Sequence, residues 1–412
     1  MELRPYLIPL YAAATLFARA LSLPFLPDTV QLTELIFPFA LWSFRREIVE
    51  QFRRYRWFSL ALALYLLTNG VSAVVSGSTD SLVEAGARGY LGLLAYVVLA
   101  HLDCYGGRSV SSWWRNTTLA VAGVCILVYL AVLLGVSEPG TWVGYIAHYP
   151  IFGPVYRLQG TATVYGMMYM LLLPGLLLAY TRFRAGRGNG AVVVPILLAA
   201  VMTLAKENLL FLIGVLLIEV QYRSKQFRTP LYLAAGGLVV ILFANTHFLL
   251  VPRGQDLTAT TFTSGRTAYS GTDYVVAETN YTANKRAALL IGSDHPWFGV
   301  GPGRFQDYTD ALVPSGDYPA HLGHFNPHSA WTGAFAETGL FGLLGLVALV
   351  ASLLHYRPEQ WTVAAVLLFL FLIASVFKDV MNFRGLWVLV GWYLADQQML
   401  AAKRGHPVRG EA

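Results

Sequence analysis

The chain has 412 residues, of which 56% are hydrophobic and only 13% are charged. Soluble domains contain about 45–50% apolar and about 25% charged residues. This composition excludes an ordinary cytoplasmic enzyme and a disordered protein, and the 2 cysteines are too few for a secreted disulfide scaffold. The formal charge of +6 favours a membrane protein over a nucleic-acid partner, because Lys and Arg collect in cytoplasmic loops.

Apolar stretches recur along the whole chain, and a transmembrane helix needs about 20 such residues. They lie near 5–26, 29–44, 57–76, 83–101, 117–136, 163–181, 190–205, 207–222, 230–250, 328–355, 360–377 and 384–401. We therefore expect an all-α integral membrane protein with about twelve transmembrane helices. Nine spans fill 1–250, a long loop with short helices fills 251–327, three spans fill 328–402, and 403–412 form a tail. The first stretch is too long for the apolar core of a cleaved signal peptide.

The basic residues predict the orientation of these spans. With both termini in the cytoplasm, 18 of the 29 Lys and Arg residues fall in inside segments. The opposite orientation would place these residues outside, against the positive-inside rule. The long loop is then expected on the outer face of the membrane.

Eleven basic residues remain in outer loops or in the outer halves of helices. They are Arg19, Arg88, Arg157, Lys206, Arg253, Arg266, Lys285, Arg286, Arg304, Lys378 and Arg384. Each could pair with Glu84, Glu207 or Asp379, or extend its charge to the interface. Charge at membrane depth is costly and usually functional, so as a set they predict a basic, outward-facing cavity for an anionic ligand such as a phosphate.

The loop 251–327 is too long for an idle connection. Residues 284–294 predict a short amphipathic helix, and the segment His295-Pro-Trp-Phe-Gly-Val-Gly-Pro-Gly-Arg-Phe305 follows it. Pro296 ends the helix, and the glycines permit tight turns. The glycine spacing does not indicate a nucleotide site, because no βαβ unit surrounds it.

Several histidines gather at the end of this loop. His321, His324 and His328 could ligate a metal, but Pro319 and Pro327 predict an irregular stretch and no carboxylate completes the site. His328 stands apart because it follows Pro327 where the tenth span begins. A histidine there can act as a general base, since its pKa lies near neutrality. The alternative is a helix-end residue that only hydrogen-bonds a loop.

Three further polar positions are candidates for the site. Glu337 lies about two and a half turns along the tenth span and either bonds a neighbouring helix or orients His328. Arg157 carries a planar fork of donors that matches phosphate oxygens. Lys206 and Glu207 occupy a very short outer turn, where they either face water and ligand or neutralise each other.

Four segments resemble motifs of the O-antigen ligase and polymerase superfamily. Pro327-His-Ser-Ala-Trp-Thr-Gly-Ala-Phe-Ala-Glu-Thr-Gly-Leu-Phe-Gly342 resembles that family's His–Asn…Leu…Glu–x–Gly–x–x–Gly stretch. Residues 295–305 resemble its His–Pro–Leu–Phe–Gly–x–Gly–x–Gly–x–Phe motif. Arg157-Leu-Gln-Gly160 resembles its helix-entry arginine, and Thr203-Leu-Ala-Lys206 resembles its Thr–x–Ser–Arg turn. The motifs follow the expected order over about half of the chain.

The resemblance implies a glycosyltransferase of the GT-C type at the periplasmic face of the bacterial inner membrane, with no metal or nucleotide cofactor. The donor in that family is a glycan linked to undecaprenyl diphosphate. The acceptor is a sugar hydroxyl, on lipid A–core in ligases and on another lipid-linked glycan in polymerases. Arginines of the family hold the diphosphate, and the motif histidine deprotonates the acceptor.

Carried over by position, the resemblance makes His328 the base and Arg157 a diphosphate ligand. Lys206 replaces the arginine of the family's turn and keeps its charge without the fork. The family's second arginine, upstream of the His–Pro motif, corresponds to Tyr281, so Arg266 and Arg286 are both candidates for its role. Supporting roles are expected for Arg88, Glu207, His295, His324 and Glu337. A single displacement without a second catalytic carboxylate predicts inversion at the anomeric carbon.

The ligase is the leading hypothesis and the polymerase follows closely. A protein-directed oligosaccharide transferase is third, because such enzymes usually carry C-terminal regions that this chain lacks. A transporter or lipid flippase would place charges along a central path, whereas the exceptional charges here lie on the outer side. A peptidoglycan polymerase of the shape and division family would use a loop aspartate, for which Asp256, Asp273 and Asp307 are the candidates.

Overall fold

The structure is a computed structural model that describes residues 3–17, 31–149, 153–162, 165–259, 262–323, 325–356 and 361–403. The described chain is mainly helical. Its α-helices are α1 (Leu7–Ala14), α2 (Leu32–Ser43), α3 (Arg45–Arg54), α4 (Arg56–Ser76), α5 (Thr79–Tyr105), α6 (Arg108–Leu133), α7 (Tyr165–Arg184), α8 (Gly190–Met202), α9 (Asn208–Tyr222), α10 (Lys225–His247), α11 (Asn280–Asp294), α12 (Phe305–Thr309), α13 (Ala330–His355), α14 (Val363–Ala374) and α15 (Arg384–Lys403). Its strands are β1 (Val143–Tyr149), β2 (Gly153–Leu158), β3 (Phe248–Pro252), β4 (Thr263–Ser270) and β5 (Tyr274–Thr279).

Among the described residues, six helices are long and apolar enough to cross a membrane: α4, α5, α6, α7, α10 and α13. Helices α8, α9 and α14 are apolar but shorter. The chain is therefore a mostly helical protein with several membrane-spanning helices. The expected count of twelve spans is not confirmed, because α2 has only 12 residues and the first expected span, 5–26, runs beyond the described residues.

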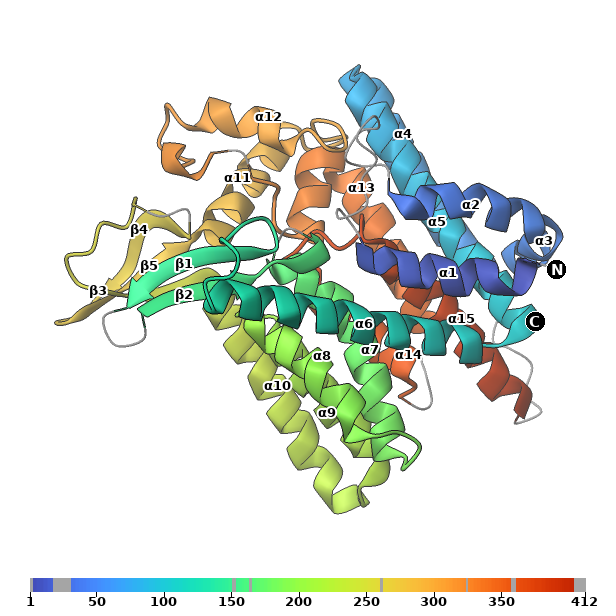
Figure 1. Ribbon diagram of the computed structural model, residues 1–412. Helices are drawn as coiled ribbons and strands as arrows, with labels where there is room; N and C mark the ends of the chain where they lie inside the picture. Colours follow the sequence, from blue (N-terminus) through green and yellow to red (C-terminus); the bar gives the residue numbers. More distant parts are fainter. Residues whose placement is uncertain are drawn as a thin grey trace.

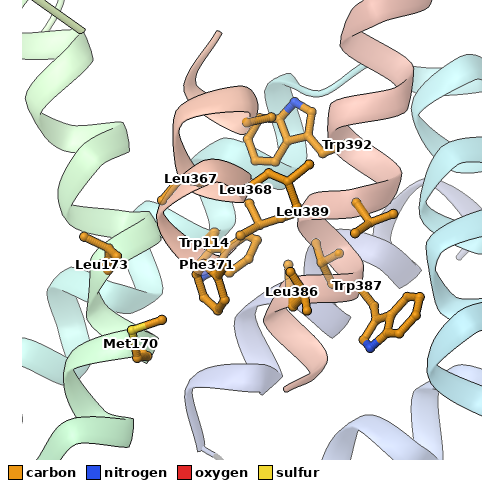
Figure 2. Close-up of a cluster of buried hydrophobic side chains, with 14 of the residues drawn as sticks. Trp114, Met170, Leu173, Leu367, Leu368, Phe371, Leu386, Trp387, Leu389 and Trp392 are labelled. Atoms are coloured by element: carbon orange, nitrogen blue, oxygen red, sulfur yellow. The ribbon is translucent and has the colours of Figure 1, made fainter. Parts of the chain in front are cut away.

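The helices pack through large side chains in the middle of the bundle. Trp114 of α6, Leu173 of α7, Phe371 of α14 and Trp387 of α15 belong to one buried cluster (Figure 2). Lipid is as apolar as these side chains, so helix association in a membrane depends on close packing rather than on transfer from water. This cluster packs α14 against α7 and α15, and Lys378, a residue of the site described below, follows α14.

Two small antiparallel sheets interrupt the helices. Strands β1 and β2 form a hairpin between α6 and α7, and the second sheet has the order β3-β5-β4 between α10 and α11. The sequence predicts an all-α protein with short helices in the long loop, and the two sheets are a correction to that prediction. The strands are short and carry Thr, Tyr and Val, residues that suit a half-buried pleated surface, so they produce no long apolar run.

The long loop folds back over the helix bundle. Helix α11 contains the expected helix 284–294 and starts four residues earlier, at Asn280. Helices α11 and α12 and the strands lie on the side of the molecule away from both chain termini (Figure 1). The loop places α11 against α10 and α13. The candidate site lies where these helices meet.

Candidate functional site

His328 lies where the long loop enters α13, in an unusual backbone conformation. Its φ is +50°, in the left-handed region, which disfavours residues with a Cβ. The side chain of Asn326 accepts a hydrogen bond from the His328 amide at 3.2 Å. Ser329 then caps α13 by accepting a hydrogen bond from the Thr332 amide. Strain of this kind persists only where the surroundings fix the residue, and it clusters at functional sites.

Two aromatic rings hold the imidazole of His328. It stacks on Tyr281 of α11, with ring centroids 4.6 Å apart and planes 29° apart, and the ring of Phe325 lies 5.6 Å away. His328 is only partly exposed. Burial, with the positive charges of Lys378 and Lys206, lowers the pKa of His328 to about 3. The imidazole is therefore neutral at physiological pH and has a nitrogen that can accept a proton.

Lys206 lies in the turn between α8 and α9. Its Nζ is 3.6 Å from the centre of the Tyr281 ring, a cation–π contact. Burial lowers the pKa of Lys206 to about 8, and the charges of Lys378, Lys285 and Arg157 act in the same direction. An anion bound among these groups would relieve that repulsion.

Lys378, which follows α14, contributes a second ammonium group. Its Nζ lies 2.8 Å from Oε1 of the fully buried Glu207. Burial opposes ionisation of Glu207, but the charge and hydrogen bond of Lys378 outweigh it and leave the pKa below its usual range. Gly166, near the start of α7, makes room for the pair, because a Cβ there would lie 2.4 Å from Lys378 Nζ.

Lys285 of α11 contributes a third ammonium group. Its Nζ donates to Nε2 of His247 at 2.7 Å, and Nδ1 of His247 donates to the carbonyl of Phe243 at 2.9 Å. Burial lowers the pKa of Lys285 to about 8. The contact with His247 ties α11 to the end of α10, and the charge of Lys285 also lowers the pKa of His328.

Arg157 of β2 holds the turn that carries Lys206. It donates to the carbonyls of Thr203 at 3.0 Å and Leu204 at 2.9 Å, and its guanidinium carbon lies 3.3 Å from the centre of the Tyr165 ring. Leu204 has a φ of +47°, so these bonds support a strained turn. Two of the five guanidinium donors are used in this way, which leaves others for a ligand.

We call Arg157, Lys206, Lys285 and Lys378 the cationic cluster. Its members come from β2, the α8–α9 turn, α11 and the segment after α14, and their charges act on Lys206 or on His328. Sequence reasoning selected Arg157, Lys206 and His328 but missed Lys285, Lys378 and Tyr281 as site residues. Both lysines are among the eleven basic residues that the sequence places in outer loops or in the outer halves of helices. That placement is the only sequence signal for them, because neither lysine lies in a recognisable motif.

The other candidate cations have partners outside this cluster. Arg266 is exposed and donates to the carbonyl of Gly316 at 2.8 Å. Arg286 pairs with Glu278 at 2.7 Å. The structure thus gives neither one a contact with His328 or the cationic cluster among the residues it describes.

The remaining histidines have local roles or lie outside the described residues. His295 is exposed, packs edge-on against Tyr308 and accepts the Gly299 amide on its carbonyl at 3.0 Å. His321 contacts the Thr263 carbonyl through Nε2 at 3.0 Å. His324 lies outside the described residues. In the part of the chain that the structure describes, no three His, Cys, Asp or Glu side chains gather as a metal site would require.

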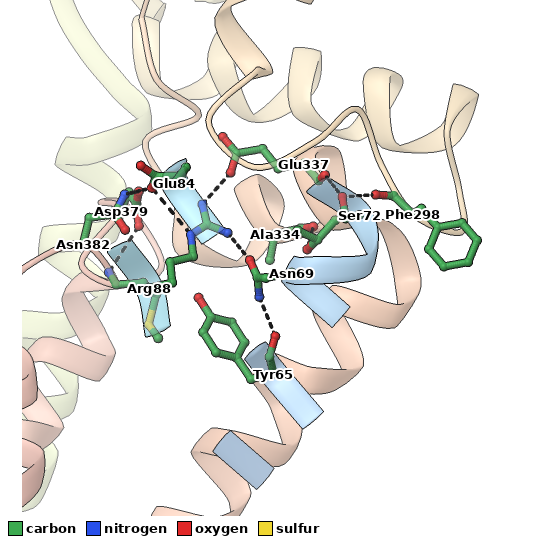
Figure 3. Close-up of polar contacts among 12 residues, drawn as sticks. Tyr65, Asn69, Ser72, Glu84, Arg88, Phe298, Ala334, Glu337, Asp379 and Asn382 are labelled. Carbon is green, nitrogen blue, oxygen red and sulfur yellow. Dashed lines mark hydrogen bonds and ion pairs between the residues drawn. The ribbon is translucent and has the colours of Figure 1, made fainter. Parts of the chain in front are cut away.

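A second polar group lies beside the first turns of α13. Arg88 of α5 pairs with Glu337 at 2.7 Å and donates to Asn69 of α4 at 2.5 Å (Figure 3). Glu337 therefore bonds a neighbouring helix, one of the two roles that its position in the sequence suggests. Arg88 also has the expected neighbour Glu84, whose Oε1 lies 3.6 Å from Nε.

The apolar helices and the polar site fit a multi-pass membrane protein whose candidate site places cations beside a histidine. Residues 191–347 match the family described as O-antigen ligase, consistent with the O-antigen ligase and polymerase superfamily. The match runs from α8 into α13 and includes Lys206, Tyr281, Lys285 and His328. A comparison with curated proteins finds no match. The family match supports a membrane glycosyltransferase that acts on lipid-linked glycans.

Proposed function

We propose that this protein is an O-antigen ligase, an inverting and metal-independent glycosyltransferase of the GT-C type. It would move a glycan from undecaprenyl diphosphate to a sugar hydroxyl of lipid A–core at the periplasmic face of the inner membrane, with both termini in the cytoplasm. The observation that carries this proposal is the convergence of a neutral, strained His328 with four cations from distant parts of the chain.

The cationic cluster is the proposed diphosphate site. Three ammonium groups and one guanidinium stand against the single carboxylate of Glu207, so the described groups carry an excess of positive charge. Such groups stabilise the charge that develops on a leaving diphosphate, and they are most effective where water is excluded. Lys206 and Arg157 keep the roles that the resemblance implies, and Lys285 and Lys378 take the place of Arg266 and Arg286.

His328 is the proposed general base. The acceptor oxygen attacks the anomeric carbon and its proton passes to a ring nitrogen of His328. The bond between that carbon and the diphosphate oxygen breaks, and undecaprenyl diphosphate leaves with the electron pair. A single displacement of this kind inverts the configuration of the anomeric carbon.

Donor binding would also make His328 a better base. Burial and the neighbouring lysines lower its pKa in the free protein. The negative charge of the diphosphate would offset Lys378 and Lys206, and an opposite charge nearby favours the protonated imidazole. The base would then gain strength only when the leaving group is in place.

Reconstitution of the purified protein tests this function. Protein is mixed with undecaprenyl-diphosphate-linked glycan, EDTA and either lipid A–core or a second lipid-linked glycan, alongside His328→Ala and Lys378→Ala variants. We expect glycan on lipid A–core with the wild type and loss of transfer in His328→Ala. Lengthened lipid-linked glycan without a lipid A–core product would assign a polymerase instead. If neither product forms while a known ligase is active in the same assay, the proposed function is wrong and the transporter hypothesis is favoured.

A further inference from the structure

Helix α13 is broken shortly after it leaves the candidate site. Gly339 has a φ of +66° and a ψ of −163° inside the helix, so residues 330–338 form a short separate helix. We call this segment the base helix, because His328 lies two residues before its first residue. Its first amide, at Ala330, donates to the carbonyl of Ser375 at 2.9 Å.

The glycine-rich turn within the His–Pro motif holds the end of the base helix. The amides of Val300 and Gly301 donate to the carbonyls of Ala336 and Glu337 at 3.0 and 2.8 Å. These are carbonyls at the C-terminal end of a short helix, where intrahelical partners are missing. Ser72 of α4 adds a hydrogen bond to the Glu337 carbonyl at 2.9 Å. The backbone at this end is therefore anchored from two sides.

Arg88 provides the side-chain anchor on the same helix. Nη2 donates to Oε2 of Glu337 at 2.7 Å and Nη1 donates to Oδ1 of Asn69 at 2.5 Å, so one guanidinium joins α4, α5 and the base helix (Figure 3). The side chains of Arg88 and Glu337 are only 8% and 10% exposed. Removing one partner of such a buried pair leaves an uncompensated charge.

The base helix borders a small cavity that Arg88 helps to line. A cavity of about 20 Å³ is lined by Arg88, Ser329, Glu337 and Asp379, among others. This volume is about that of one water position. Ser329 is the cap of the base helix and the direct neighbour of His328, so the cavity borders the residues that set the position of the base.

We infer that Arg88 is a positioning residue: through Glu337 and the base helix it holds His328 against Tyr281. The inference rests on the proposed function, because it gives Arg88 its effect through the proposed base. Loss of the guanidinium would enlarge the cavity, free the base helix and shift His328. The side chains of the cationic cluster lie on other segments, and the cluster meets the base helix through the backbone carbonyl of Lys378, which accepts from the Ala330 amide at 3.2 Å, so donor binding should persist.

Two measurements on the full chain in detergent or lipid discs test this inference. Hydrogen exchange of peptides covering 328–338 reports the anchoring without any substrate. The kcat of glycan transfer and the Kd of the undecaprenyl-diphosphate-linked donor report the effect on the site. The variants are Arg88→Gln, Arg88→Lys, and Arg88→Gln combined with Glu337→Gln, which removes both charges in case the single variant fails to fold.

Arg384→Gln is the matched control. Arg384 also forms an outer-side ion pair, with Glu34 at 2.5 Å and 18% side-chain exposure, but that pair joins α15 to α2 and does not include α13. Both single variants should lose stability of the kind expected from breaking a partly buried pair. Only the Arg88 variants should accelerate exchange in 328–338.

We expect Arg88→Gln to lower kcat about 100-fold, the size of loss that a displacement of about 1 Å produces, with donor Kd unchanged within about threefold. Arg88→Lys should lose less, because it retains the charge but lacks the fork. The inference is overturned if exchange in 328–338 is unchanged, or if it accelerates while kcat stays at the wild-type value. A wild type that transfers no glycan would instead overturn the proposed function, and the exchange measurement would still decide the anchoring.

Discussion

The imidazole of His328 stacks on the phenol ring of Tyr281, with centroids 4.6 Å apart. The same phenol ring carries the Lys206 ammonium group 3.6 Å from its centre. One aromatic side chain on the first turn of α11 therefore connects the proposed base to the proposed diphosphate site. Lys285, one turn later on α11, adds a positive charge that also acts on His328.

Two substitutions of Tyr281 distinguish the contribution of its ring from that of its hydroxyl. Tyr281→Phe keeps both the stack and the cation contact, so transfer should stay within about threefold of the wild type. Tyr281→Leu loses the cation–π contact of about 0.5–2 kcal/mol, or roughly 2- to 30-fold in donor affinity, and also frees the imidazole. Steady-state kinetics of the two variants check this. Equal losses of transfer in Tyr281→Phe and Tyr281→Leu would show that the hydroxyl, rather than the ring, is needed.

Donor affinity should fall as the pH rises above 8. The pKa values of Lys206 and Lys285 are lowered to about 8 by burial, so both lysines lose their charge above that pH. For each lysine whose charge is needed to bind the donor, the donor KM should then rise about tenfold for every pH unit above the pKa of that lysine. Lys206→Arg should show a smaller rise, because arginine stays protonated. The exposed Lys225→Arg is the control, and the same rise in all three proteins would contradict the assignment.

The acid side of the pH profile should differ between free and donor-bound protein. A lowered pKa keeps His328 neutral, and therefore basic, down to about pH 3 in the free protein. The acid limb of kcat/KM, which reports the free protein, should thus lie well below the usual histidine value. The acid limb of kcat should lie at higher pH, because the bound diphosphate raises the pKa. One common limb near the usual histidine value in both profiles would refute this coupling.

Gly299 and Gly339 each pack closely against the backbone of the segment that carries the other glycine. A Cβ at Gly299 would lie 2.3 Å from the backbone carbon of Glu337, and a Cβ at Gly339 would lie 2.3 Å from the backbone carbon of Trp297. Both glycines also have positive φ. Gly299→Ala and Gly339→Ala should each destabilise the fold by more than about 1 kcal/mol, seen as a lower melting midpoint.

Gly89→Ala is the matched control for these two glycines. It lies in α5 with nothing within 4 Å of its added Cβ, so alanine there should leave the melting midpoint unchanged or raise it, by up to about 1 kcal/mol of helix propensity. Because Gly299 and Gly339 share one contact region, the double alanine variant should lose less than the sum of the two losses. Additive losses would mean that the two segments are stabilised independently.

The long apolar helices and the entry of α13 could be predicted because long apolar runs and a Pro-His-Ser start produce local signals, whereas the count of twelve spans is not confirmed. The sheet β3-β5-β4 could not, because its short strands contain Thr, Tyr and Arg and depend on pairing across the loop. The glycines at 299–303 can be recognised in the sequence, but the segment that packs against Gly299 is the one that contains Gly339. A single sequence does not show which distant segments meet.

The candidate site was accessible in part for the same reason. His328, Arg157 and Lys206 lie in motifs, whereas Lys378 and Lys285 are isolated cations whose role depends on where their helices end. Arg266 and Arg286 were reasonable candidates for the missing arginine by their distance along the chain. In three dimensions Arg266, on β4, bonds the carbonyl of Gly316, and Arg286, on α11, pairs with Glu278 of β5.

The proposed role of His328 is tested by following the release of undecaprenyl diphosphate from a purified lipid-linked donor together with the transferred glycan, for wild type and His328→Gln. Glutamine keeps a polar side chain but cannot take the proton of the acceptor. We expect coupled release and transfer in the wild type. In His328→Gln we expect a rate at least about 100-fold lower, at the lower end of what a general base contributes, with donor binding intact. Transfer by His328→Gln within about threefold of the wild-type rate, at matched donor occupancy, would show that His328 is not the base.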